Sequence, residues 1–286
     1  MRLLAFVLVV SLIPVGALAQ DAIPASDTAS ADARKPLSSS TQSGSMPERK
    51  FVFSLLMGGQ VQPDYFGSRD MELRPAFRPN FLLLSLGEHT RFGGKTDFND
   101  DDPLDRPLGF TVGASFNYIS SRKSSDHSEL FGLQDVDGSV EIGGAVGYVW
   151  PNAETFATLR YGVTGHKSFV GEVGAFWVTR PAKKLVFRVG PRLEFGSDGF
   201  ADTYFGVTPA EAAASQFNAY NPDGGLYSAG LDMIATYQLN KRWWLEGRLR
   251  WQKLVDDAAD SPIVLAGDDD VVIFTLGVRR TFTINF

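Results

Sequence analysis

From residue 51 to its last residue, the chain repeatedly alternates apolar with small or polar residues and then shows a turn signal. The last segment is the clearest case. Its even positions from Val272 to Phe286 are apolar apart from Arg280, whereas its odd positions from Thr275 to Asn285 are small or polar. Period-2 alternation predicts a β-strand with one apolar and one polar face. The same pattern predicts strands at 185–195 and 243–253.

Further strands are predicted at 51–61, 71–78, 81–88, 108–119, 139–150, 154–165, 168–179, 200–207 and 226–239. The total is about twelve, and an even number is typical of single-chain bacterial outer-membrane barrels. Merging 71–88 into one strand and dropping 200–207 gives ten as the alternative. We prefer twelve, because the tight turns at 79–80, 166–167, 198–199 and 240–241 share one side when 81–88 and 200–207 are separate strands. We predict that side to be periplasmic, with 120–138 as a long exception.

The N-terminus has the features of a secretory signal peptide. Arg2 precedes an apolar run over residues 3–15, and Ala17-Leu18-Ala19 forms a small-residue cleavage site. The run is shorter than the roughly 20 residues that a membrane-spanning helix needs. We therefore predict a signal peptide at 1–19. Residues 20–50 are rich in Ser, Ala, Asp and Pro and predict a flexible tail, which leaves 51–286 for the barrel.

A soluble β-sandwich also alternates apolar and polar residues. Export, and aromatic residues such as Trp150, Trp177 and Trp243 near strand ends, favour instead a transmembrane antiparallel β-barrel in the outer membrane. The terminal aromatic Phe286 resembles the recognition signal of the barrel-assembly machinery, so outer-membrane lipid, lipopolysaccharide and that machinery are expected partners. The fold class is therefore all-β.

Composition excludes several classes of function. The chain has no cysteine, which excludes disulfides, thiolate metal sites and a cysteine nucleophile. Its net charge of −6 has the wrong sign for a protein that coats nucleic acid.

Several blocks resemble the MipA/OmpV family of outer-membrane proteins. In chain order they are 65–68, 130–133 with Asp135, Tyr204-Phe205-Gly206-Val207 with Thr208, 220–225, and Leu254 with Asp257-Ala258-Ala259-Asp260-Ser261-Pro262-Ile263. The resemblance covers nearly all of 51–286, although the last strand departs from the common family ending. It implies a scaffold for murein-synthesising complexes, with a lytic transglycosylase and a penicillin-binding murein synthase as partners. A narrow channel or stress-responsive porin, and a surface adhesin acting through loops 89–107 and 208–225, are the alternatives.

Charged residues on the polar faces of the predicted strands should share the barrel interior. They are Arg188, Arg192, Glu194, Glu246, Arg248, Arg250 and Arg279. A barrel of this size has a narrow lumen. These residues suit either ion pairs that close it or an anion-selective pore, and the sequence is compatible with both.

No catalytic, cofactor or metal site is predicted. His166 with Ser168 is the nearest approach to a base and nucleophile, and we interpret it as part of a turn. The acidic runs at 97–102 and 268–270 lack calcium-loop spacing and are interpreted as solvated loops. Asp260-Ser261-Pro262 and the segment from Thr208 to Glu211 predict helix caps.

Overall fold

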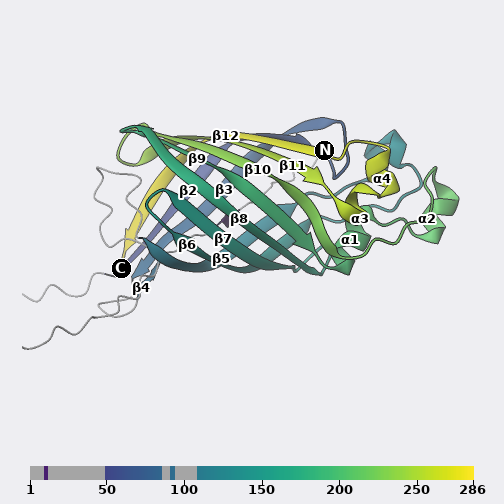
Figure 1. Cartoon of the computed structure of the whole chain (residues 1–286), viewed down its shortest axis with the longest axis horizontal. Helices are drawn as coiled ribbons and strands as arrows, with labels where there is room; N and C mark the ends of the chain where they lie inside the picture. Colours follow the sequence, from purple (N-terminus) through teal and green to yellow (C-terminus); the bar gives the residue numbers. More distant parts are fainter. Residues whose placement is uncertain (1–9, 12–48, 86–90, 94–107) are drawn as a thin grey trace, which may run out of the picture.

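The computed structural model of the chain describes residues 10–11, 49–85, 91–93 and 108–286 (Figure 1). Most of the predicted signal peptide and tail, and the acidic run at 97–102, lie outside these residues. None of the helices in the described residues combines the length and the apolar character of a membrane-spanning segment.

The described residues form one antiparallel sheet of twelve strands, ten of them long. The long strands are β2 (Lys50–Pro63), β3 (Met71–Ser85), β5 (Gly109–Ile119), β6 (Ser139–Val149), β7 (Ala153–Gly162), β8 (Phe169–Ala182), β9 (Leu185–Gly196), β10 (Gly225–Gln238), β11 (Trp243–Leu254) and β12 (Asp270–Asn285). The short strands β1 (Val10–Ser11) and β4 (Arg91–Gly93) are the two edges of the sheet, paired with β5 and β3. Chain neighbours pair throughout β5 to β12.

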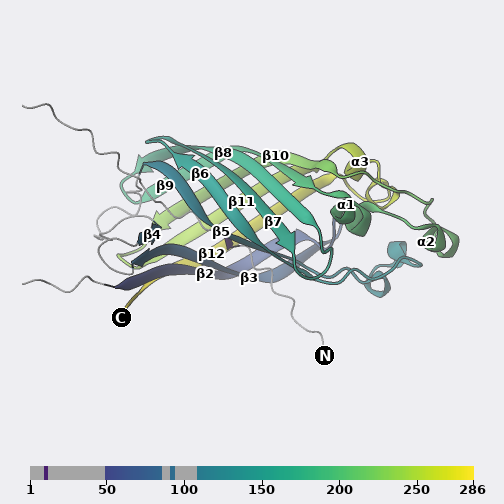
Figure 2. The same cartoon turned by 90° about the horizontal axis from the view of Figure 1, so that it is seen from below.

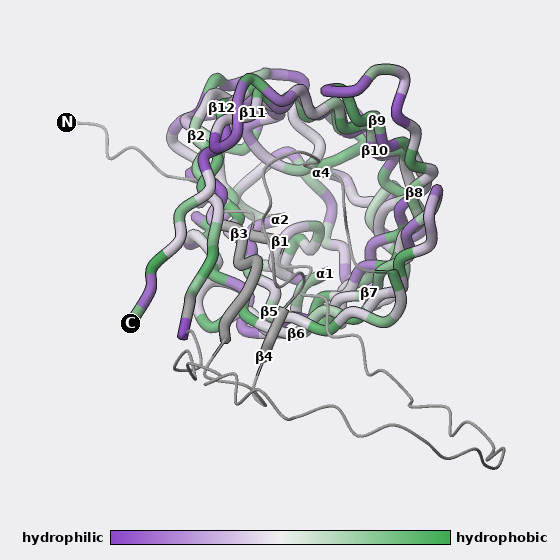
Figure 3. Tube along the Cα trace, turned by 90° about the vertical axis from the view of Figure 1, so that its left-hand side faces the viewer, coloured by the Kyte–Doolittle hydropathy of each residue, from purple (hydrophilic) through white to green (hydrophobic). Residues whose placement is uncertain are grey.

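β12 pairs with β2, in a register that runs from Phe274↔Val61 to Asn285↔Lys50, so the last strand of the chain continues the sheet into β2 and β3. The whole sheet curls into a barrel (Figure 1). Viewed along the axis, the strands form a ring (Figure 3). The two edges face each other across a seam, where β4 contacts β5 and β1 contacts β3. The predicted fold class, an antiparallel β-barrel, is confirmed.

Two predicted strands are wrong, and the ten long strands correspond to the alternative of ten. Residues 71–85 form one strand, because β3 pairs with β2 from Pro63↔Met71 to Lys50↔Ser85, straight through Pro79. The predicted strand 200–207 falls largely on helix α1 (Asp198–Phe205), which buries Phe200, Ala201, Tyr204 and Phe205. Burial at intervals of three to five residues is the pattern of a helix face, whereas a strand face repeats every second residue.

The two ends of the barrel differ. One end carries the segments 64–70, 120–138, 197–224 and 255–269, which we call the cap (Figures 1 and 2). The cap contains α1, α2 (Pro209–Ala214), α3 (Asp256–Ala259), α4 (Pro262–Leu265) and the 3₁₀ helices η1 (Ser124–Asp126) and η2 (Ser128–Leu130). The opposite end has the tight turns 150–152, 183–184 and 239–242 and the end of β12.

The predicted grouping of turns on one side is therefore wrong. Residues 166–167 and 198–199 lie at the cap end, 240–241 lies at the opposite end, and 79–80 lies inside β3. The loop 120–138 belongs to the cap and is not an exception among short turns. Each miscounted strand reverses the side on which every later turn falls, and the two wrong strands account for the error.

The barrel is apolar outside and polar inside. Trp177 is 63% exposed, whereas Asp232 is 0% exposed and Glu141 only 1%. A soluble protein has the opposite polarity. An apolar outer surface around a charged interior is the arrangement of a transmembrane barrel.

An apolar core fills the mouth at the cap end. Phe200, Tyr204 and Phe205 of α1 pack there with Leu254 and Val264, and Phe66 packs edge-on against Tyr204. Tyr227 of β10 contacts the same cluster from the strands. The cap thus packs onto the ends of the strands as well as onto itself.

Candidate functional site

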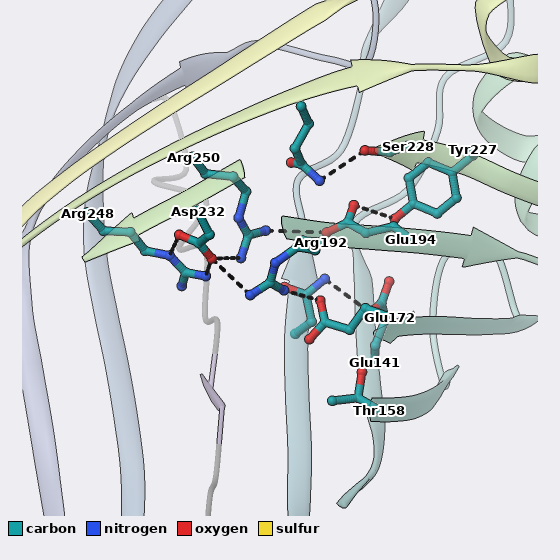
Figure 4. A network of polar contacts seen from close by, with 12 residues as sticks. Glu141, Thr158, Glu172, Arg192, Glu194, Tyr227, Ser228, Asp232, Arg248 and Arg250 are labelled. Atoms are coloured by element: carbon teal, nitrogen blue, oxygen red, sulfur yellow. Dashed lines mark hydrogen bonds and ion pairs between the residues drawn. The ribbon is translucent and has the colours of Figure 1, made fainter. Parts of the chain in front are cut away.

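Charged side chains of alternating sign cross the lumen from strand to strand (Figure 4). Glu141 Oε2 on β6 lies 2.9 Å from Arg160 Nε on β7, whose Nη1 lies 3.3 Å from Glu172 Oε1 on β8. The line continues through Arg192 on β9 to Asp232 on β10 and Arg248 on β11. We call these six residues the charge belt: Glu141, Arg160, Glu172, Arg192, Asp232 and Arg248.

Asp232 is the centre of the belt. Its Oδ1 accepts a hydrogen bond of 2.7 Å from Arg248 Nε, and its Oδ2 accepts one of 2.9 Å from Arg192 Nη2. Arg250 Nη2 lies 3.6 Å from the same Oδ2. Three guanidinium groups, from the two strands that flank β10, therefore converge on one fully buried carboxylate.

All seven lumen charges named from the sequence lie on the interior face, and each is paired. Arg188 Nε lies 3.5 Å from Glu154 Oε1, and Arg250 Nη1 lies 3.5 Å from Glu194 Oε1. Arg279 donates to Glu246. Sequence reasoning missed four members of the charge belt: Glu141, Arg160, Glu172 and Asp232. The signal was present, since each occupies the polar phase of an alternating strand.

Pairing leaves the described lumen close to neutral. Seven arginines there pair with seven carboxylates. A further arginine, Arg78 on β3, donates instead to Gln60 Oε1 at 2.9 Å and Thr275 Oγ1 at 3.0 Å. Such pairing favours an interior held by ion pairs over one lined with free positive charge.

The blocks that carried the family resemblance hold the cap together. Tyr204, Phe205 and Val207 are buried, and Val207 bridges to Tyr220 through two backbone hydrogen bonds. Gly206 ends α1, where a Cβ would lie 2.5 Å from the Asp202 carbonyl oxygen.

The second block ties α3 and α4 to the rest of the cap. Ser261 caps α4 with Pro262 in the first turn, and its Oγ donates to the Phe205 carbonyl oxygen at 2.6 Å. Asp257 Oδ2 accepts from the Asp223 amide at 2.7 Å, and the Asp260 amide donates to the Asp256 carbonyl. These polar groups are occupied in fixing the cap.

The predicted capping box at Thr208 is confirmed. Thr208 accepts from the Glu211 amide, and Glu211 accepts from the Thr208 amide at 2.8 Å. The Gln134 amide also donates to Glu211, which links α2 to the 120–138 loop. Burial raises the pKa of Glu211, but the hydrogen bonds from Gln134 and Thr208 outweigh it, so this pKa lies below its usual value.

His166 joins the cap to the charge belt. Its Nδ1 lies 2.7 Å from Ser168 Oγ and accepts from the Ser168 amide, which assigns the ring proton to Nε2, 3.3 Å from Glu141 Oε1. These contacts have the connectivity of a base between a nucleophile and a carboxylate. However, the ring is 0% exposed and packs edge-on against Phe200 at 5.2 Å, so we interpret His166 as part of the packing between the cap and the strands.

The remaining sequence candidates lie at the two ends. Asp269 pairs with Lys253 at 2.7 Å, and Asp270 accepts a hydrogen bond from Trp251. Two of the three carboxylates in the 268–270 run therefore already have partners within the protein. Phe286 is 60% exposed at the end opposite the cap, and its amide donates to the Arg49 carbonyl.

Comparison with known proteins gives a family. The chain matches the model of the family described as MltA-interacting protein MipA over residues 55–282. The MltA-interacting proteins of Escherichia coli (strain K12) and Shigella flexneri are each 32% identical to the chain over 80 residues, which is 28% of this chain and 32% of each relative. The matched stretch thus spans about a third of those relatives.

Among solved structures, the outer membrane protein OprG from Pseudomonas aeruginosa aligns over 83% of this chain and 97% of its own. The identity is 10% and the TM-score is 0.27, values too low to carry an argument. The family match needs no such support, because it runs from β2 into β12. The chain belongs to the MltA-interacting protein MipA family.

Proposed function

We propose that the protein is a non-enzymatic barrel of the outer membrane that binds a lytic transglycosylase and serves as a scaffold for murein-synthesising complexes. The observation that carries this proposal is the family match over residues 55–282. The apolar outer face supports the membrane placement, and the predicted signal peptide supplies the export route. Because ion pairs occupy the lumen, we assign partner binding to the ends of the barrel and not to its interior.

We further propose which end meets the partner. In outer-membrane barrels the periplasmic turns are short and the extracellular loops are longer. This rule assigns the tight turns 150–152, 183–184 and 239–242 to the periplasm and the cap to the outside. Murein lies in the periplasm, so the transglycosylase binds at the tight-turn end, where the tail predicted at 20–50 leads into β2.

Affinity purification from cross-linked cell envelopes tests both proposals. Recovery of a lytic transglycosylase or a penicillin-binding synthase, above an unrelated barrel, supports the scaffold. Recovery of only the barrel-assembly machinery and lipopolysaccharide counts against it. Deleting residues 24–46 should reduce recovery of the partner, whereas Leu265→Ser, on an exposed cap residue, should leave it unchanged.

A narrow anion channel is the second candidate, and Arg78 is the observation that favours it. This lumen arginine contacts amide and hydroxyl oxygens and, among the described residues, no carboxylate. It adds one positive charge to an otherwise paired interior. Conductance of the refolded protein in planar bilayers separates the two candidates.

A further inference from the structure

Four residues with metal-binding side chains meet at the rim of the cap. Asp64 and Asp70 lie at the two ends of the turn between β2 and β3, which the Asp64 amide closes by donating to the Asp70 carbonyl at 3.1 Å. His127 lies between η1 and η2, and Glu129 lies in η2. We call Asp64, Asp70, His127 and Glu129 the rim cluster. It joins two segments that are more than fifty residues apart.

Three members of the rim cluster have the spacing of metal ligands. One ligand atom each from Asp70, His127 and Glu129 lies within 4.8 Å of the other two. His127 Nδ1 lies 3.8 Å from Glu129 Oε1. A tetrahedral zinc site with bonds of about 2.0 to 2.3 Å sets its ligand atoms roughly 3.3 to 3.8 Å apart. Small side-chain movements are enough to bring the three groups around one ion.

The surroundings orient these ligands, as the outer groups of metal sites do. Asp64 Oδ2 lies 3.9 Å from His127 Nε2, on the side of the ring that faces away from Glu129. A carboxylate on the far side of a metal-binding histidine helps to orient its ring. Asp64 Oδ1 is buried without a hydrogen-bond partner. Tyr65 donates to Glu129 Oε1 at 3.0 Å and packs edge-on against the His127 ring at 5.0 Å.

The ligand carboxylates of the rim cluster lack a lysine or arginine partner among the described residues, whereas Arg74 lies near Asp64. In the part of the chain that the structure describes, neither Asp70 nor Glu129 forms an ion pair with lysine or arginine. The 268–270 run differs, because Lys253 neutralises part of its charge and the run contains no imidazole. A mixed set of imidazole and carboxylate ligands suits a transition-metal dication, whereas calcium prefers oxygen alone.

We propose that the rim cluster binds one divalent transition-metal ion, with zinc as the best match, through Asp70, His127 and Glu129. Asp64 and Tyr65 position the histidine and the glutamate, and water completes the coordination. The ion clamps the 120–138 loop of the cap onto the β2–β3 turn. The site is separate from the charge belt and from the partner contact proposed above.

Titration calorimetry tests the site on the untagged, full-length protein, refolded in detergent and stripped with a chelator. We expect one zinc ion per chain, with His127→Ala and Asp70→Asn each weakening binding more than about tenfold and Asp64→Asn by about 10 to 100-fold. Asp126→Asn, on an exposed residue of η1, is the matched control and should bind as tightly as the wild type. Zinc binding that is not saturable, or that His127→Ala leaves unchanged, overturns the proposal.

A second measurement removes dependence on folding of the variants. Cobalt added to the stripped wild-type protein should give a visible absorption band of a four-coordinate site, and zinc should abolish it. A spectrum identical to that of aqueous cobalt overturns the proposal. Heat-modifiable electrophoretic mobility identifies variants that have folded.

Discussion

At the scale of single residues, Asp232 has the strongest role in the lumen. Its carboxylate is fully buried and forms ion pairs with the guanidinium groups of Arg192, Arg248 and Arg250. A buried ion pair adds little net stability over an apolar pair, but removal of one partner leaves an uncompensated charge. The belt therefore fixes how the strands are positioned, and the barrel depends on its completeness.

Asp232→Asn should destabilise the barrel by about 3 to 5 kcal/mol, because three guanidinium groups lose their shared carboxylate. Urea unfolding in micelles, followed by heat-modifiable mobility, measures the change. The control is Asp202→Asn on the exposed face of α1, for which a change within about 0.5 kcal/mol is expected. Equal stability of the two variants contradicts the role given to Asp232.

Phe286 provides a second test at this scale. Its ring is exposed at the end opposite the cap, so its loss removes little packing from the barrel. Deletion of Phe286 should nevertheless slow assembly in cells, measured as a reduced fraction of folded, heat-modifiable protein in the outer membrane. Assembly at the wild-type level means that this aromatic is no assembly signal.

The alternation of residues predicted which face each lumen charge occupies, but not its partner. Arg192 was placed inside from the pattern of 185–195, and its contact with Asp232 joins residues forty positions apart. That contact depends on the register between β9 and β10, which a β-bulge between Leu226 and Ser228 shifts. No local pattern in either strand specifies such a register.

At the scale of elements, local signals predicted α2 and failed for α1. Thr208 and Glu211 form a capping box and Pro209 occupies the first helical position, so these local signals were sufficient to predict the helix. Residues 198–205 lack comparable caps, since the Ser197 side chain makes no capping hydrogen bond. The helix forms there because Phe200, Tyr204 and Phe205 pack into the barrel mouth, and this tertiary contact overrides the local alternation.

Glu211 gives the cap a defined pH dependence. Its pKa is lower in the folded protein than its usual value, so its stabilising contribution is complete above the unfolded pKa and is lost as pH falls through the folded pKa. Protection of the Gln134 and Thr208 amides, measured by hydrogen exchange and corrected for intrinsic rates, should fall as the pH drops below the usual pKa of a glutamate side chain. Glu211→Ala, which has no side-chain acceptor for these amides, should show low protection at every pH. Protection independent of pH in the wild type contradicts this assignment.

At the scale of the whole molecule, polarity was predictable and orientation was not. The apolar face of each strand followed from period-2 alternation, and the structure places these faces outside. The predicted side of each turn depended on the number of strands before it. The errors at 71–88 and 200–207 therefore assigned the turns that lie between these two segments to the wrong end of the barrel. The cap is assembled from four segments that are separated in the sequence and lie at one end of the barrel (Figure 1).

The paired lumen predicts a closed barrel. The refolded full-length protein should show no regular conductance steps in planar bilayers, because the charge belt crosses the interior and the cap core fills one mouth. Regular steps that Arg78→Gln abolishes would favour the anion channel. Steps from an unrelated porin in the same bilayers provide the positive control.

The central claim is that this barrel binds a lytic transglycosylase, and direct binding between purified components tests it best. The barrel in nanodiscs is titrated with the soluble transglycosylase of the same cell, next to nanodiscs that carry an unrelated barrel. The account predicts saturable binding to the first alone, weakened by deletion of residues 24–46. Equal binding to both nanodiscs, or none to either, would contradict it.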